Sequence, residues 1–329
     1  MDYVIADAGR LELGYLENTE TLDIDVGDTN DFELTIPRER SEYFGIQKGY
    51  CIFVPNTEFG GMIEEIQSAT SETNITYRGN VWRLYLDQLI IEPPSGQAYR
   101  TVSGDANSII AQILTQGTGL LFDVPDEDSG IYISSYRFRY VSALSGLSAM
   151  LEAQGGRLDI KAIQGDSNEP FRVVVRAVKI QNYSEELEYN GDDNINVNVQ
   201  KYERGINHLI CLGQGELTER LVIHLYAQLD GSISQTRKYY TGTAERTAVY
   251  DFSNAEQDEL LDSGIERLKE LMNSSSADMD IEDANLEIGD IVTARDRDAG
   301  IVLSRPIVNK ILRFSDGRES VEHKVKGEN

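Results

Sequence analysis

Apolar and polar residues alternate along most of the chain, which is the pattern of β-strands with one buried face. The alternation is clean in the segments LDIDV, FELTIP, NITYRGN and INVNV, and turn residues separate them. Residues 1 to about 102 are therefore predicted to be strands, starting with a hairpin around Gly9. Further strands are expected in HLICLGQG, LVIHLYAQ and RKYYTG. Strands at this spacing are typical of a barrel or a sandwich.

Three segments show a helical period instead. The predicted helices cover residues 105–117, 142–156 and 254–273. Asp105 can cap the first helix, and leucines three or four residues apart form the apolar stripe of the second. Ser253 and Glu256 have the spacing of a capping box at the start of the third helix. A hairpin is expected between the second and third helices, around the loop QGDSNEP.

One strand pattern occurs twice, from Gln47 to Gly79 and from Glu287 to Gly327. Each copy has a glycine turn, an apolar strand, a polar excursion, an I/V-x-x-I strand, a turn, and an alternating strand that ends in glycine. The matched positions are Gly49 with Gly289, Ile63 with Val308, Ile66 with Ile311, and Gly79 with Gly327. This repeat predicts two similar β-barrels in one polypeptide, which favours assembly over catalysis.

The fold class predicted from these patterns is mostly β, α+β and multidomain, with two tube-like β-barrel domains. Residues 1–102 would form the first barrel, and residues 103–181 a small inserted α+β domain. Residues 182–329 would form the second barrel, with its C-terminal part at about 277–329. Inserted strands and the 254–273 helix would be a further α/β decoration of that barrel.

The net charge is −26, from 30 Lys and Arg against 56 Asp and Glu. Nucleic-acid binding draws on basic contacts to phosphate, so sequence-specific binding is not expected. An acidic surface can instead repel nucleic acid so that it passes without sticking, and acidity that only keeps the protein soluble is an equal explanation. No apolar run approaches the ~20 residues that span a bilayer, so no membrane insertion is expected. No signal peptide is visible, so synthesis in a cytoplasm is expected.

The cysteine and histidine content indicates no metal site. Cys51 and Cys211 each lie inside an apolar strand, so both are predicted to be buried, reduced thiols. Three histidines, His208, His224 and His323, are scattered along the sequence, whereas zinc needs about four nitrogen or sulfur ligands. No cofactor is expected.

The acidic clusters have a plain structural interpretation. The segment from Asp23 to Asp31 superficially resembles a calcium loop, but it lacks the twelve-residue spacing that ends in Glu. Its alternation favours a strand with solvated acids. The segments from Pro125 to Gly130 and from Asn190 to Asn194 are predicted to be turns.

Motifs for catalysis are missing from the sequence. G-x-S-x-G and H-E-x-x-H do not occur, and GQGELTER lacks the third glycine of a phosphate loop. A glycosidase would need two carboxylates across a cleft, and the many acids single out no pair. The chain is not predicted to be an enzyme, and no catalytic, cofactor or metal residue is proposed.

One strand combines aromatic and basic residues. In YISSYRFRY, alternation would place Tyr132, Tyr136 and Tyr140 on one face and Arg137 and Arg139 on the other. An ordinary half-buried strand and a strand that contacts sugar or protein both fit this pattern.

Two stretches of the chain have a familiar combination of motifs. The first, Glu58 to Leu114, contains R-G-x-x-W-R-x-x-L-D followed by PPSG, and the second, Arg204 to Leu271, contains G-Q-G-E-L. With them, nearly the whole chain resembles the baseplate-hub, or tail-hub, proteins of long-tailed bacteriophages and prophages.

The resemblance implies a ring-shaped homotrimer at the distal end of the tail tube, in the virion. Each subunit would supply two barrels, so that six barrels match a sixfold tube to a threefold tip. The implied partners are distal tail or tube proteins, the tape-measure protein, and tip or fibre proteins, while DNA passes through without specific binding. Related proteins often carry a C-terminal lytic domain. This chain ends at its second barrel copy, so separate proteins are expected to digest the wall.

Two other functions remain open on the sequence. One is a virion-associated hydrolase that cleaves cell-wall glycan or peptide with an acidic pair. The other is a carbohydrate-binding tail module with a concave aromatic strip.

Overall fold

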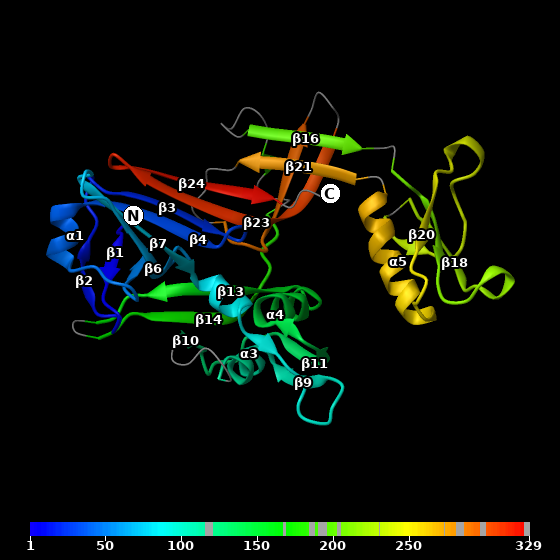
Figure 1. Cartoon of the computed structure of the whole chain (residues 1–329), viewed down its shortest axis with the longest axis horizontal. Helices are drawn as coiled ribbons and strands as arrows, with labels where there is room; N and C mark the ends of the chain where they lie inside the picture. Colours follow the sequence, from blue (N-terminus) through cyan, green and yellow to red (C-terminus); the bar gives the residue numbers. More distant parts are fainter. Residues whose placement is uncertain are drawn as a thin grey trace. The chain divides into compact units, whose positions relative to one another are not determined.

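The computed structural model describes residues 1–115, 121–166, 169–183, 188–189, 196–202, 205–229, 231–272, 274–280, 286–296 and 301–325. The chain divides into two compact units (Figure 1). Unit 1 is built from Met1–Val197 and Met279–Val325, and unit 2 from Asn198–Asp278. The structure is mostly β, as the alternation predicts. The domain limits expected from the sequence stay a prediction.

One open sheet of eleven strands dominates unit 1. Its strands are β1 (Val4–Ala6), β2 (Glu12–Tyr15), β3 (Thr21–Val26), β4 (Asp31–Pro37), β5 (Cys51–Phe53), β6 (Gly60–Ser68), β7 (Asn74–Val81), β15 (Glu188–Tyr189), β22 (Ile291–Asp296), β23 (Ile301–Ser315) and β24 (Arg318–Val325). Their order is β15-β22-β23-β3-β4-β7-β6-β5-β1-β2, and β24 pairs with β23. The expected hairpin around Gly9 is present as β1 and β2.

The two predicted barrels are not closed. None of the sheets formed by the described strands closes into a barrel. Instead, β23 pairs antiparallel with β3, with Lys310 opposite Val26. This pairing joins the two ends of the chain into one sheet (Figure 1).

The repeated sequence pattern corresponds to a repeated three-stranded meander, β5-β6-β7 in the first copy and β22-β23-β24 in the second. Gly49 and Gly289 have positive φ angles of 89° and 97°, and each occupies the third position of a tight turn. The N–H of Gly49 donates to the carbonyl of Ile63 at 2.8 Å, and the N–H of Gly289 donates to that of Ile307 at 2.8 Å. Glycine is needed here because this turn requires a left-handed residue.

The positional match from the sequence is wrong by one residue in the second strand. Ile63 corresponds to Ile307, not to Val308, because these two residues accept the equivalent hydrogen bonds. A β-bulge follows each, between Ile63 and Glu65 and between Ile307 and Asn309. The bulge inserts one extra residue and reverses the alternation, so a pattern read at period two loses its register there. Gly327 lies outside the described residues.

Two short helices occur where strands were expected, α1 (Arg38–Phe44) and α2 (Trp82–Asp87). The polar α1 has no apolar stripe. It ends at Gly45, which has a left-handed backbone conformation and donates its N–H to the carbonyl of Ser41 at 2.9 Å. The six residues of α2 mix strand formers (Trp82, Tyr85) with helix formers, and Trp82 and Leu86 are buried one turn apart. Tertiary packing therefore decides between two local structures that the segment could adopt.

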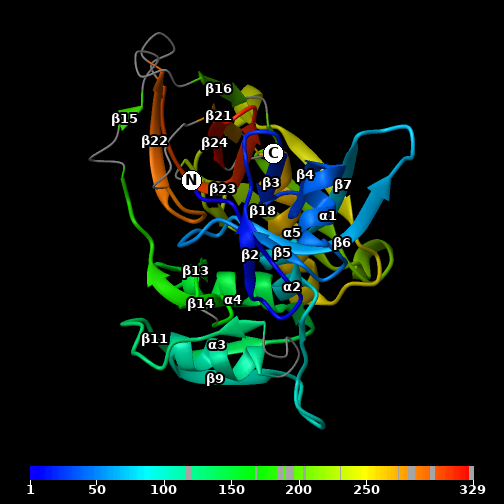
Figure 2. The ribbon, with the colours of Figure 1, turned by 90° about the vertical axis from the view of Figure 1, so that its left-hand side faces the viewer.

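The segment after α2 forms small sheets around two helices. Its elements are β8 (Ile90–Ile91), β9 (Arg100–Asp105), α3 (Ala106–Leu114), β10 (Phe122–Asp123), β11 (Tyr132–Phe138), β12 (Val141–Ser142), α4 (Ala143–Glu152), β13 (Gly156–Ile163) and β14 (Arg172–Lys179). The pairs are β9 with β11, β8 with β12, and β13 with β14 and β10. Both predicted helices, α3 and α4, are present (Figure 2). Asp105 caps α3 by accepting the N–H of Asn107 at 2.8 Å.

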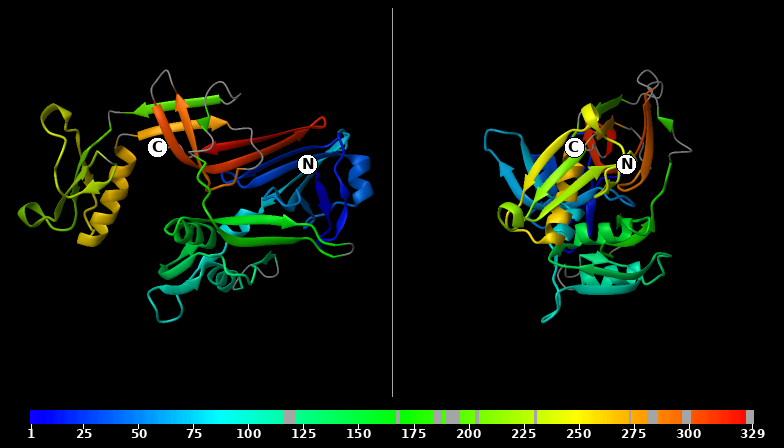
Figure 3. Two further views of the ribbon diagram at one scale, coloured as in Figure 1. Left: turned by 180° about the vertical axis from the view of Figure 1, so that it is seen from behind. Right: turned by 90° about the vertical axis from the view of Figure 1, so that its right-hand side faces the viewer.

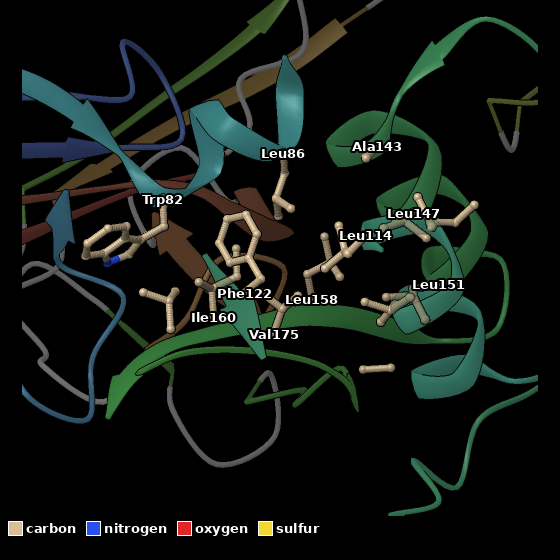
Figure 4. Packing of buried hydrophobic residues seen from close by; sticks show 14 of the residues in the cluster. Trp82, Leu86, Leu114, Phe122, Ala143, Leu147, Leu151, Leu158, Ile160 and Val175 are labelled. Carbon is tan, nitrogen blue, oxygen red and sulfur yellow. The ribbon is translucent and has the colours of Figure 1, made fainter. Parts of the chain in front are cut away.

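The apolar side chains of α3 and α4 share one core with the face of the large sheet that carries Val4 and Ala6 of β1 and Phe53 of β5. Figure 4 shows Leu147 and Leu151 of α4 facing Leu158 of β13, with Trp82 at the far end. The rings of Phe53 and Phe171 stack with centroids 4.3 Å apart, which joins the sheet to this core. Burying one such side chain contributes about 1.5–3 kcal/mol. The other face of the sheet has a core of its own.

Unit 2 is a four-stranded sheet with one helix on a single face (Figure 3). Its elements are β17 (His208–Leu212), η1 (Leu217–Glu219), β18 (Val222–Ala227), β19 (Ile233–Ser234), η2 (Gly242–Ala244), β20 (Thr247–Asp251) and α5 (Gln257–Leu271). Two further strands, β16 (Asn196–Tyr202) and β21 (Ser274–Asp280), pair with each other. The expected strand in RKYYTG is wrong, and β20 lies just after it.

The helix α5 lies close to its sheet because Gly264 has no side chain. A Cβ at Gly264 would lie 2.6 Å from Sγ of Cys211 and 2.9 Å from Leu225. The predicted capping box at its N-terminus is wrong. The N-cap residue is Glu256, and no side chain caps the helix. Ser253 belongs to a separate turn, in which the N–H of Ala255 donates to the carbonyl of Phe252.

Candidate assembly surfaces

The two meanders are held together by a cluster of buried charges. Glu58, at the end of the first meander's loop, pairs with Arg83 of α2 at 2.5 Å, and the two side chains are 3% and 8% exposed. Lys310 of β23 lies 3.8 Å from Glu58 and makes a closer ion pair with Glu287. The Lys310 ammonium also sits 5.1 Å from the ring centre of Phe59. Two acids and two bases therefore neutralise each other between segments far apart in the sequence.

The turn of the second meander is anchored to β13. Nε of Arg157 donates to Oδ1 of Asp290 at 2.8 Å, and Asp290 also accepts the N–H groups of Gln181 and Glu287. Burial disfavours the charge on Arg157, yet the Asp290 carboxylate outweighs this effect and raises the pKa of Arg157. The meander is thus fixed by a charged hydrogen bond rather than by apolar contact alone. No sequence motif marks these residues, because their spacing is set by the fold.

Strand β2 ends the large sheet and pairs only with β1 among the described strands. Three alternate residues are exposed here: Leu11 (39% exposed), which directly precedes β2, and Leu13 (39%) and Tyr15 (49%) within it. An edge strand with exposed apolar residues is a ready surface for pairing with another chain.

The β9–β11 ribbon is exposed on one face. Its pairing shifts between Ile133 and Tyr136, so the predicted alternation is only partly correct. Tyr136 is half-buried, whereas Tyr132 is 70% exposed. Arg137 and Arg139 point outward, and their guanidinium carbons lie 5.5 Å and 5.7 Å from the ring centre of Tyr99.

Two of the three histidines meet in unit 2, contrary to the expectation that all are scattered. Nε2 of His208 lies 2.8 Å from Nδ1 of His224, and the ring of Tyr226 stacks on His208 at 4.4 Å. Nδ1 of His208 faces Oε1 of Glu245 at 2.9 Å and the hydroxyl of Thr247 at 3.0 Å. Burial lowers the pKa of His208 despite the nearby Glu245 carboxylate. The pairing arises from the β17–β18 register, which the sequence does not reveal.

Comparison with solved structures finds proteins of similar architecture. The prophage MuSo2 43 kDa tail protein from Shewanella oneidensis is similar at 11% identity and a TM-score of 0.54, covering 100% of this chain and 99% of that one. The prophage tail protein gp18 from Listeria monocytogenes EGD-e is similar at 10% identity and a TM-score of 0.51, covering 100% and 95%. No protein-family model and no curated protein matches the sequence.

The chain has the fold of phage tail proteins. The resemblance expected from the sequence is thereby confirmed at the level of the fold. In this tail-protein fold, the β2 edge and the outer face of the β9–β11 ribbon hold most of the exposed large apolar and aromatic side chains among the described residues of unit 1.

The acidic segments of the tail-protein fold shape its turns. Oδ1 of Asp25 accepts the N–H groups of Asp28 and Thr29 and the side-chain amide of Asn309 at 2.8 Å, so it ties the β3–β4 turn to β23. In the Pro125–Gly130 segment, the N–H and the hydroxyl of Ser129 donate to Asp105, and the N–H of Gly130 donates to Oδ1 of Asp128, so acidic side chains hold this loop. The Asn190–Asn194 segment lies outside the described residues. No group of three or more metal-ligating side chains occurs in the described part of the chain.

Both cysteines are buried and free, as predicted. Burial raises the pKa of Cys51 to about 12 and that of Cys211 to about 11, so both thiols stay protonated at neutral pH. No helix among the described residues is long and apolar enough to cross a bilayer.

Proposed function

We propose that the chain is a structural component of a phage or prophage tail and that it forms the hub ring at the distal end of the tail tube. The fold of prophage tail proteins supports the tail role. The observation that carries the hub proposal is the twin meander, in which one polypeptide repeats the same glycine turn and bulge. Three copies of the chain would present six such meanders. A homotrimer can therefore match a sixfold tube to a threefold tip.

Ring closure would use the free edges of the open sheet. The exposed Leu11, directly before β2, and Leu13 and Tyr15 within it give this edge an apolar strip. Closing the sheet between subunits would remove its edges and complete, across the trimer, the barrels that a single chain leaves open. The partners in this proposal are distal tail or tube proteins, the tape-measure protein, and tip or fibre proteins.

The proposed ring acts by shape and interface rather than by turnover. Its acidic composition would repel DNA from the channel wall, so that the genome passes without binding. The location that follows is the tail tip or baseplate of the virion. A hydrolase would instead release reducing sugar or peptide from purified cell walls, and we expect no release.

Electron microscopy of purified tails tests the proposal. Deleting the coding sequence should leave tubes that lack a distal ring, and a tag placed on unit 2 should label only the distal end. Tails that are complete without the chain, or labelling elsewhere along the tube, would overturn the proposed function.

A further inference from the structure

The outer face of the β9–β11 ribbon is a basic and aromatic surface on an otherwise acidic protein. Between Asp128 and Glu152 the sequence contains no Asp or Glu, although the whole chain carries 56 of them. Arg137 and Arg139 are exposed and pair with no carboxylate in the described part of the chain. Their charge is therefore available to a partner.

Aromatic side chains frame these two arginines. The Tyr99 ring lies under both guanidinium groups, which restricts their freedom before any partner binds. Tyr132 and Tyr140 are 70% and 66% exposed at the two ends of the strand segment. Tyrosine and arginine are among the residues enriched at the centres of protein interfaces. The composition of this face is that of a docking surface for an anionic partner.

The same chain carries a matching anionic row on α5. Asp258, Asp262 and Glu266 are exposed at successive i, i+4 positions, and no cation pairs with them among the described residues. Like charges at this spacing destabilise an isolated helix by about 0.2–0.5 kcal/mol per pair. A basic partner would relieve this repulsion.

The two surfaces also match in spacing. Arg137 lies in β11 and Arg139 directly follows the last residue of that strand. Both guanidinium carbons lie over the Tyr99 ring, at 5.5 Å and 5.7 Å, so the two side chains project to one side. Residues two apart in an extended chain are about 6.6–6.8 Å apart. Residues four apart on a helix, such as Asp258 and Asp262, are separated by about 6 Å along its axis. Each guanidinium can then meet one carboxylate when the helix lies along the strand.

We propose that the β9–β11 face of one copy binds the acidic row of α5 on a second copy of this chain. The contact rests on the proposed ring, since it is heterologous and such contacts close into rings when the rotation permits. The facing groups are Arg137 and Arg139 with Tyr99 on one side, and Asp258 and Asp262 on the other.

Ionic strength sets the conditions of the test. Two copies of charge −26 repel each other. At 0.15 M salt the Debye length is about 8 Å, so the net repulsion is largely screened while contacts of 3–4 Å are not. Sedimentation velocity at this salt should show self-association of the wild-type protein that disappears near 1 M.

Charge reversal identifies the surfaces. Arg137→Glu with Arg139→Glu, and separately Asp258→Lys with Asp262→Lys, should each weaken self-association at least about tenfold. Mixing these two variants should restore association, because their faces are again complementary. The control Arg172→Glu with Lys179→Glu makes the same charge change on exposed residues of β14 and should leave association unchanged.

Cross-linking then separates contacts between copies from contacts within one copy. Arg137→Lys with Arg139→Lys keeps the charge and supplies amines that carbodiimide couples to carboxylates. Mixed heavy- and light-isotope protein should give mixed peptide pairs between β11 and α5. Pairs only within one copy, reversal variants that associate normally, or a wild-type protein that stays monomeric would each overturn the contact. The distal ring seen by microscopy would still stand in all three cases, so the proposed function fails or survives separately.

Discussion

Lys310 offers the sharpest test of how the two ends of the chain are joined. Its side chain is 3% exposed and lies between the carboxylates of Glu58 and Glu287. Lys310→Met keeps the length of the stem over Phe59 but removes the charge. Glu58 keeps Arg83 as a partner, whereas Glu287 loses its buried cation. Removing one partner of a buried pair costs about 3–5 kcal/mol, and the partial exposure of Glu287 places the expected loss near 3 kcal/mol.

The single tryptophan makes this loss measurable. Trp82 is fully buried and adjacent to Arg83, so its fluorescence reports on unit 1 alone. With a urea m-value of about 3 kcal/mol/M, the midpoint should fall by about 1 M. The control is Arg313→Met on the same strand, where the side chain is 49% exposed and pairs with Glu322. That variant should lose less than about 1 kcal/mol. Equal losses in the two variants would refute a buried ionic link.

Three further outcomes follow. Gly289→Ala should destabilise unit 1 by about 1–3 kcal/mol, because φ is +97° and the new Cβ would lie 3.0 Å from Arg157; Gly96→Ala, with open space at φ +79°, should cost less by urea titration. The folded-state pKa of His208 is lowered, so the unfolded chain binds the proton more readily, and unit 2 should lose stability as the pH falls below about 6.5. Thermal melts of His208→Gln should show a weaker dependence of stability on pH than the wild-type protein, and an equal dependence would contradict this reasoning. Leu13→Lys on the β2 edge should prevent ring formation in assembled tails without changing urea stability, and normal rings would argue against that edge as an interface.

Local features of the fold were accessible from the sequence. The Asp105 cap, the helices α3 and α4, the β13–β14 hairpin and the turn at Gly49 each depend on residues close together in the chain. The buried thiols were accessible too, because both lie in apolar strands. The resemblance to phage tail proteins came from ordered motifs along the whole chain, and the fold confirms it.

Features that depend on strand register could not be obtained this way. The equivalence of Ile63 and Ile307 is visible only from the hydrogen bonds that each accepts, and the bulge in β11 separated Tyr132 from Tyr136. The meeting of His208 and His224 depends on the β17–β18 register. Alternation gives the faces of a strand, but it does not say where an extra residue is inserted.

By itself, the sequence determined where strands, turns and most helices form, and that one meander occurs twice. Only the tertiary structure decided that β3 pairs with β23, so that both meanders belong to one open sheet. It also brought Lys310 to Glu58, and it left Arg137 and Arg139 exposed, with no carboxylate partner in the part of the chain that the structure describes. The physical reason is that propensity and periodicity act over a few residues. Strand pairing and charge compensation are instead selected by the burial of surfaces from distant parts of the chain.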